Sequence, residues 1–91
     1  MKYRILATKR FQKDVKRCQK RTLPMDRLKN VIGLLESAGC LPSEYHPHKL
    51  SGIYEGKWEC HIMSDWLLVW EQNDDDLVLL MTNTGTHSDI F

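Results

Sequence analysis

The hydrophobic pattern of this sequence changes its period near residue 40, and that change restricts the possible folds more than any other feature. Between residues 9 and 38, apolar side chains recur every three or four positions, which is typical of helices that bury one face. After residue 40, apolar residues alternate with polar ones or form short continuous runs, which is typical of strands. We therefore expect helices first and a sheet afterwards.

Local signals set the ends of two predicted helices. The first spans residues 9–20, and Thr8 is expected to cap its N-terminus. Pro24 suits the first turn of the second helix. Gly39 is its expected C-cap, because glycine readily takes the left-handed conformation found there. The connection "RTLP" is short, so the two helices are predicted to be antiparallel.

The strands follow from the other segments. "YRILAT" indicates a first strand, and "KWECHI", "WLLVWE" and "LVLLMTN" indicate three more, separated by the turn-like "MSD" and "NDDD". In "KWECHI", Glu59 and His61 fall on the face opposite Trp58, Cys60 and Ile62. The predicted order is β-α-α-β-β-β. This is an α+β fold in which an antiparallel sheet packs against a helical pair, and residues 1–91 are expected to form a single domain.

Several classes of protein do not fit the sequence. No apolar run approaches the ~20 residues that span a bilayer, and "MKYRILATKR" lacks the features of a signal peptide. The three cysteines are isolated, which argues against a disulfide framework or a zinc knuckle. We expect a cytoplasmic protein with no membrane contact, no metal and no cofactor.

Charge is distributed very unevenly along the chain. Residues 1–30 contain eleven Lys and Arg but two Asp and Glu, a net charge of +9, whereas residues 31–91 have a net charge of −8. A positive surface of this kind favours RNA or an acidic protein as partner. Six cations share one face of the first predicted helix, opposite its apolar residues, and are candidates for binding a polyanion: Lys9, Arg10, Lys13, Lys16, Arg17 and Lys20.

Three histidines stand where a sheet end and a chain terminus could meet. His48 follows a proline-containing loop, His61 lies on a strand, and His87 lies in the C-terminal segment "TGTHSDIF". Metal-free RNA cleavage needs a base for the 2′-OH and an acid for the leaving 5′-oxygen, and histidine suits both roles. Asp65 could orient such a group, and Trp66 and Phe91 could stack on bases.

Each of these residues also has a purely structural interpretation. A single histidine is more often structural than catalytic, and His46 is the one least expected to take part. Trp66 precedes the apolar run "LLVW", where core packing is the commoner role. A metal site is a weak alternative, because His46 and His48 lack a second ligand pair at zinc-like spacing. The residues alone indicate an RNA-binding or acidic-protein-binding domain, with a histidine-based nuclease as the sharper hypothesis.

Longer segments resemble a known family. "HKLSGIYEGKWECHIMSDWLLVWE", the terminal "TGTHSDIF" and the early "FQKDVK" are similar to the YafQ branch of the RelE-type toxins of bacterial toxin–antitoxin systems. The resemblance covers essentially the whole chain. It implies a RelE-like fold, with two helices on a curved antiparallel sheet, and an endoribonuclease that cuts mRNA in the ribosomal A site.

The resemblance also implies residue roles and partners. The family's catalytic residues correspond to His48, His61, Asp65 and His87. By their chemistry, His87 is expected to be the acid, and His48 or His61, steered by Asp65, the base. Trp66, Phe91 and Asn83 are expected at the substrate, and the cations of the first helix on ribosomal RNA. The implied partners are the 70S ribosome, mRNA, and a cognate antitoxin that alone binds operator DNA.

One departure from the family leaves alternatives open. Asn83 stands where the family usually has arginine, which would stabilise the charge of the transition state. A catalytically weakened toxin that mainly binds its antitoxin as a corepressor is therefore one alternative. A gyrase-inhibiting toxin of the ParE branch is another, although such a protein has no need of paired acid and base groups.

Overall fold

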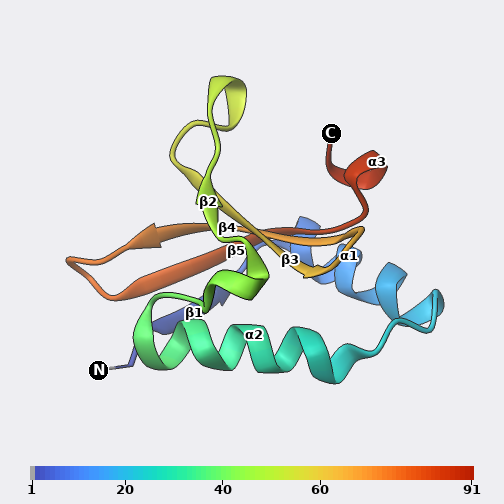
Figure 1. Ribbon diagram of the computed structural model, residues 1–91, viewed down its shortest axis with the longest axis horizontal. Coiled ribbons are helices and arrows are strands. Elements are labelled where there is room, and N and C mark those ends of the chain that lie inside the picture. Colours follow the sequence, from blue (N-terminus) through green and yellow to red (C-terminus); the bar gives the residue numbers. More distant parts are fainter. Residues whose placement is uncertain (1) are drawn as a thin grey trace.

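The computed structural model describes residues 2–91, which form a five-stranded sheet with three helices (Figure 1). None of the helices in this part of the chain combines the length and the hydropathy that crossing a bilayer requires. In chain order the elements are β1 (Arg4–Ala7), α1 (Lys9–Lys20), α2 (Met25–Ala38), β2 (His48–Lys49), β3 (Lys57–Met63), β4 (Trp66–Asn73), β5 (Val78–Gly85) and α3 (His87–Ile90), with two short 3-10 turns, η1 (Ser43–Tyr45) and η2 (Gly52–Tyr54).

The strand order in the sheet is β1-β5-β4-β3-β2. β2 through β5 pair in antiparallel fashion, whereas β1 pairs with β5 in parallel. The α+β class and the helical pair on a largely antiparallel sheet are confirmed. The parallel edge, the two-residue β2 and the short α3 are additions to the predicted order. Hairpin signals reveal only neighbours along the chain, and β1 reaches β5 across nearly the whole sequence.

The predicted helix ends at Thr8 and Gly39 are confirmed, whereas Pro24 is the N-cap that precedes α2 and not part of its first turn. The Thr8 hydroxyl accepts a hydrogen bond from the Phe11 N–H at 3.0 Å and so caps α1. Gly39 ends α2 in the left-handed conformation, with φ of 69°. A side chain at Gly39 would meet the ring of Tyr3 at 2.5 Å, so this position needs glycine for space as well as for conformation.

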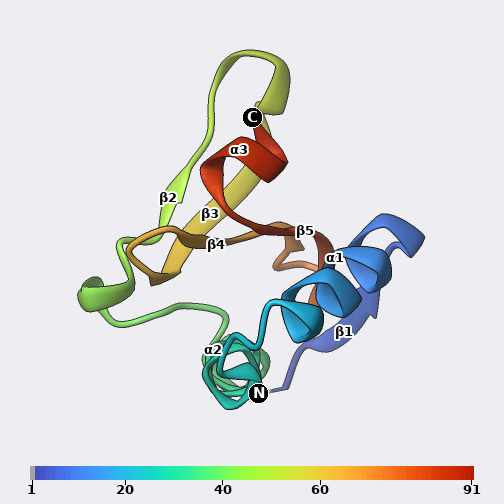
Figure 2. The same ribbon diagram turned by 90° about the vertical axis from the view of Figure 1, so that its right-hand side faces the viewer.

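The main core lies between the two helices and one face of the sheet. Phe11, Cys18, Leu28, Val31 and Leu35 supply the helical side. The view in Figure 2 looks roughly along α1 and α2, which lie next to each other against the sheet. The sheet contributes the residues that alternation assigns to its inner face: Cys60, Ile62, Trp66, Leu68, Trp70, Leu79 and Met81.

The opposite face of the sheet is only partly covered. Figure 1 shows α3 and the arm between β2 and β3 on the side of the sheet away from α2. Leu67 and Val69 point to this side and are fully buried, with Ile90 of α3 and Leu50 packed against them. The apolar centre of this face is therefore covered, and the polar residues around it are the candidates for a functional role.

Candidate active site

The predicted site residues gather on the sheet face that does not carry the core. Strand register places His48, Glu59, Val69 and Asn83 side by side across β2, β3, β4 and β5. Side chains paired across neighbouring strands point to the same side. His61, two residues along β3 from Glu59, therefore shares this face.

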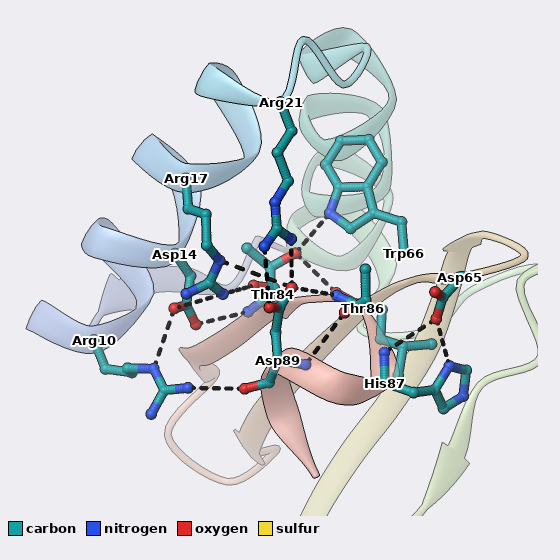
Figure 3. Close-up of polar contacts among 11 residues, drawn as sticks. Arg10, Asp14, Arg17, Arg21, Asp65, Trp66, Thr84, Thr86, His87 and Asp89 are labelled. Atoms are coloured by element: carbon teal, nitrogen blue, oxygen red, sulfur yellow. Dashed lines mark hydrogen bonds and ion pairs between the residues drawn. The ribbon is translucent and has the colours of Figure 1, made fainter.

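His87 and Asp65 form a direct pair at one end of this face (Figure 3). Asp65 Oδ1 lies 2.7 Å from His87 Nδ1 and 3.0 Å from the His87 backbone nitrogen, so one carboxylate holds both the ring and the backbone. The hydrogen bond from the His87 side chain lowers the pKa of Asp65, and the backbone N–H lowers it further. An ionised carboxylate only accepts hydrogen bonds. His87 Nδ1 therefore carries the proton, and Nε2 is left to exchange one with a substrate.

A second group surrounds Glu59. Its Oε1 lies 3.2 Å from His48 Nε2 and 3.8 Å from His61 Nε2. The His46 carbonyl accepts a hydrogen bond from His48 Nδ1 at 2.8 Å, which leaves Nε2 facing Glu59. Glu59 is only 4% exposed, and its Oε2 has no hydrogen-bond partner within residues 2–91. A buried carboxylate oxygen without a partner is costly and is often found at a binding site.

His61 connects the two groups. Its ring centroid lies 6.5 Å from that of His48 and 5.9 Å from that of His87. Three imidazoles and two carboxylates from separate segments thus surround one small region of the sheet. Groups this close could act on opposite sides of a single phosphate. Among residues 2–91, no three His, Cys, Asp or Glu side chains are arranged to hold a metal ion.

A network of arginines and aspartates holds the C-terminal turn on α1 (Figure 3). Arg21 donates to the Asp89 carboxylate at 2.6 Å, and Arg10 donates to the Asp89 carbonyl at 3.2 Å. Asp14 is fully buried and accepts from Arg10, Arg17 and the Thr84 backbone N–H. These contacts join α1 to the end of β5 and to α3, which carries His87.

The segment "TGTH" has one structural task at each position. Thr84 accepts a hydrogen bond from Trp66 Nε1 and donates to the Leu67 carbonyl. Gly85 leaves room for Asp89, whose carboxylate lies 2.8 Å from where a side chain would begin. Thr86 and Asp89 form a capping box at the start of α3. His87 is thereby held at the first position of a fixed turn.

This site and fold match a known family. The sequence model described as bacterial toxin of type II toxin-antitoxin system, YafQ, matches residues 3–91. The chain belongs to the YafQ family. The mRNA interferase toxin YafQ of Escherichia coli K12 is 37% identical over 82 residues, which are 89% of this chain and 87% of that protein.

Solved structures of YafQ proteins show the same fold. A crystal structure of YafQ from E. coli strain BL21(DE3) aligns with a TM-score of 0.91 at 33% identity and covers 98% of both chains. The E. coli DinJ–YafQ toxin-antitoxin complex aligns with a TM-score of 0.90 at 34% identity and covers 100% of this chain and 99% of that one.

The structure corrects the expected roles of Trp66 and Asp65 in this YafQ family member. Trp66 was expected to stack on substrate, but it is 2% exposed in the core on the helical side of the sheet. From the core, its Nε1 donates a hydrogen bond to the Thr84 hydroxyl. Asp65 was expected to steer His48 or His61, but it binds His87. The sequence places Asp65 in the hairpin just after His61, and only the folded tail brings His87 to it.

Phe91 and Asn83 both lie on the histidine side of the sheet, and their expected role at the substrate stays a prediction. Phe91 is 53% exposed, and its ring packs edge-on against Tyr54 at a centroid distance of 5.0 Å. The Tyr54 hydroxyl donates to the Ile90 carbonyl at 3.1 Å, so the β2–β3 arm supports the tail. Asn83 is half-buried in the row that contains Glu59 and His48.

Glu59 is the site residue that sequence reasoning missed. The alternation of "KWECHI" had already put it on the face of His61, two residues away. That signal was available, but nothing in the sequence shows that the carboxylate is buried between two histidines. Without the structure, a glutamate would be expected to lie exposed to solvent.

The cations of the first helix divide into two groups. Arg10 and Arg17 bind Asp14 and the C-terminal turn and are therefore structural. Neither guanidinium is fully available to a partner, which corrects the expectation for these two residues. Four cations are exposed and form no salt bridge within residues 2–91; we call them the lysine face: Lys9, Lys13, Lys16 and Lys20.

The tail network predicts a pH-dependent stability. The Arg21 guanidinium and the Thr86 N–H hold the pKa of Asp89 well below its usual range. A carboxyl with a depressed folded pKa stabilises the protein fully above its unfolded pKa of about 3.9; the contribution begins to fall below that value and is lost only as pH falls through the folded pKa. We expect Asp89→Asn to lower the free energy of unfolding by about 2 kcal/mol at pH 7, and by progressively less as the pH falls below about 3.9.

Urea unfolding followed by tryptophan fluorescence at several pH values measures this difference. Asp75→Asn is the matched control, because Asp75 lies exposed in the β4–β5 turn and should show no such loss. A deficit for Asp89→Asn that does not shrink as the pH is lowered from 7 toward about 2, well below the unfolded pKa of about 3.9, would contradict the role given to the Arg21 pair.

Proposed function

We propose that this chain is a ribosome-dependent endoribonuclease toxin that cleaves mRNA in the ribosomal A site and is neutralised by a cognate antitoxin. The observation that carries the proposal is the placement of the His87–Asp65 pair beside the His48–Glu59–His61 group. The name of the E. coli relative, an mRNA interferase toxin, supports mRNA as the substrate. This role places the protein in the cytoplasm, where the ribosomes are.

His87 is the proposed general acid. Asp65 fixes Nδ1 and stabilises the imidazolium, so Nε2–H is positioned to protonate the departing 5′-oxygen. The tail network and the capping box hold His87 by its backbone as well, which limits the entropy lost on reaching the reactive geometry. Phe91, in the same turn, is the proposed platform for a base next to the cut.

The proposed base lies in the Glu59 group. His48 or His61 removes the proton from the 2′-OH, and Glu59 takes the orienting role that sequence reasoning gave to Asp65. The 2′-oxygen then attacks phosphorus as the bond to the 5′-oxygen breaks. The products are a 2′,3′-cyclic phosphate, or its 3′-phosphate after hydrolysis, and a 5′-OH end. The reaction needs no metal or cofactor.

Cleavage mapping in a bacterial translation extract tests the nuclease and the His87 pair together. We expect in-frame cuts that require ribosomes, and a loss of about 10²–10⁴-fold in His87→Ala, the range typical of a general acid. Asp65→Asn should also lower the rate. Because Asp65 acts through His87, the double variant should cut no more slowly than His87→Ala alone.

Naked mRNA without ribosomes is the control for that experiment. Cuts that persist without ribosomes, or that form in His87→Ala at the wild-type rate, would contradict the proposal. Additive losses in the double variant would mean that Asp65 works independently of His87.

A weakened toxin that mainly binds its antitoxin is the second candidate, and Asn83 favours it. Asn83 lies in the row of Glu59 and His48, so an arginine here would place its charge at the phosphate. Asparagine donates hydrogen bonds without charge. We expect Asn83→Arg to raise the cleavage rate, by up to about 10²-fold if the missing charge limits the reaction.

Asn83→Gln is the matched control, because it lengthens the side chain without adding charge. The cleavage rate in the extract and growth arrest on expression measure the effect. Equal activity of all three proteins would show that charge at position 83 does not limit this enzyme.

The lysine face is the proposed contact with ribosomal RNA and with the antitoxin, which would bind operator DNA for the complex. Its four cations are exposed on one helix, as a phosphate-binding surface requires. We expect Lys13→Ala together with Lys16→Ala to weaken ribosome binding and to reduce its salt dependence by roughly one unit of log–log slope per lysine.

Sedimentation with 70S ribosomes at several salt concentrations measures this. Lys2→Ala with Lys29→Ala removes the same charge elsewhere and should leave the slope unchanged. Hydrogen exchange tests the second role. If the backbone amides of α1 exchange as fast in the complex with the antitoxin as in the free protein, the lysine face is excluded as the antitoxin surface.

A further inference from the structure

A hollow adjoins the candidate active site and is not used by the proposed chemistry. It measures about 460 Å³ and lies between the first turn of α2, the η1 turn and the end of β3. Pockets for small ligands are typically about 300–1,000 Å³, so this one has room for one nucleotide. His61 lines it and also contacts the catalytic group, so the hollow and the reaction centre share a wall.

The walls of this hollow carry groups that complement a nucleotide. Arg27 is exposed at one side and forms no salt bridge within residues 2–91, where the arginines that do so are Arg10, Arg17 and Arg21. Its guanidinium is therefore available for a phosphate. Glu44 lines the same hollow without pairing with Arg27, so its carboxylate is available to accept from a base edge.

Two rings supply a surface for the base itself. Tyr45 is half-buried against the core, and His46 is exposed next to it. The His46 ring packs edge-on against His61 at a centroid distance of 5.7 Å. His46 has a left-handed backbone, with φ of 50°, and immediately precedes Pro47, a combination that few residues adopt. The backbone of η1 thus directs this ring toward the catalytic histidine.

We propose that this hollow is a specificity subsite for the nucleotide next to the scissile phosphate. The proposal rests on the proposed function, because the subsite is filled by the same RNA that is cut. The base lies against Tyr45 and His46, Arg27 binds the flanking phosphate, and Glu44 accepts a hydrogen bond from the exocyclic amino group of the base. Uracil, which has no amino group, is disfavoured.

Binding of mononucleotides tests the subsite without any cleavage. Cytidine and uridine 5′-monophosphates differ at the amino position, and neither contains a bond that the enzyme could cut. In titrations of the ¹⁵N-labelled protein, we expect cytidine monophosphate to shift the amides of residues 44–46 and 62–64. Its affinity should exceed that of uridine monophosphate by about fivefold or more, the lower end for a good base contact.

Three variants assign the contacts. Glu44→Gln should remove the preference for cytidine, and Arg27→Ala should weaken both nucleotides alike. Arg4→Ala removes an exposed arginine from β1, which β5 and β4 separate from the β3 wall of the hollow, and should change neither. Equal affinity for the two nucleotides, shifts confined to other surfaces, or an Arg27→Ala variant that binds as well as the wild type would overturn the subsite.

Cleavage maps separate this proposal from the proposed function. Glu44→Gln should even out the base preference at one position beside the cuts in a translation extract, whereas Arg4→Ala should not. An unchanged preference in Glu44→Gln would count against the subsite even if cleavage is robust. If the wild type makes no cuts, the proposed function fails, and the mononucleotide titrations still decide whether the hollow binds nucleotides.

Discussion

The arrangement of the site depends on the hydrogen bonds and ion pairs that the buried Asp14 carboxylate forms. It lies on α1, fully shielded from water, and accepts from two arginines and from the backbone of Thr84. A buried charge is tolerated only when it is well paired, and removing one partner typically costs about 3–5 kcal/mol. Asp14 therefore fixes where α1 meets the end of β5, and the same arginines continue to Asp89 and hold the turn that carries His87.

The two faces of the sheet have different tasks because strand side chains alternate. The inner face is filled with apolar residues that pack under α1 and α2. Trp66 and Trp70 are among them, and the partly buried Trp58 packs against this core. The outer face has a small apolar centre beneath Ile90 and Leu50, with the ionisable groups around it. Stability and chemistry are thus separated on the same strands, and substitutions at the histidines leave the main core intact.

The two carboxylates of the site are in contrasting environments, which suits two roles. Asp65 is largely exposed, and its hydrogen bond from His87 lowers its pKa, so it stays ionised beside the proposed acid. Glu59 is buried between His48 and His61, with one oxygen unpaired. A carboxylate in such a place orients the neighbouring rings and leaves an acceptor for a substrate hydroxyl. Asn83 lies in the same row and brings no charge to it.

Much of the fold was predictable from the sequence, because local chemistry decides it. The period change near residue 40, the Thr8 cap and the Gly39 end of α2 each follow from a few adjacent residues, and each is confirmed. The three catalytic candidates His48, His61 and His87 were also found from the sequence, and they do converge on one sheet face.

Only the tertiary structure decided which groups pair. Asp65 binds His87 and not the other histidines, Glu59 is buried between two rings, Trp66 points into the core, and Arg10 and Arg17 serve the tail. These facts depend on contacts between residues as far apart as α1 and the C-terminus, and on which side of a strand each side chain faces. Residue types and spacing determined what chemistry the chain could perform. The distances and burial that select one partner among several arise only when the distant segments pack together.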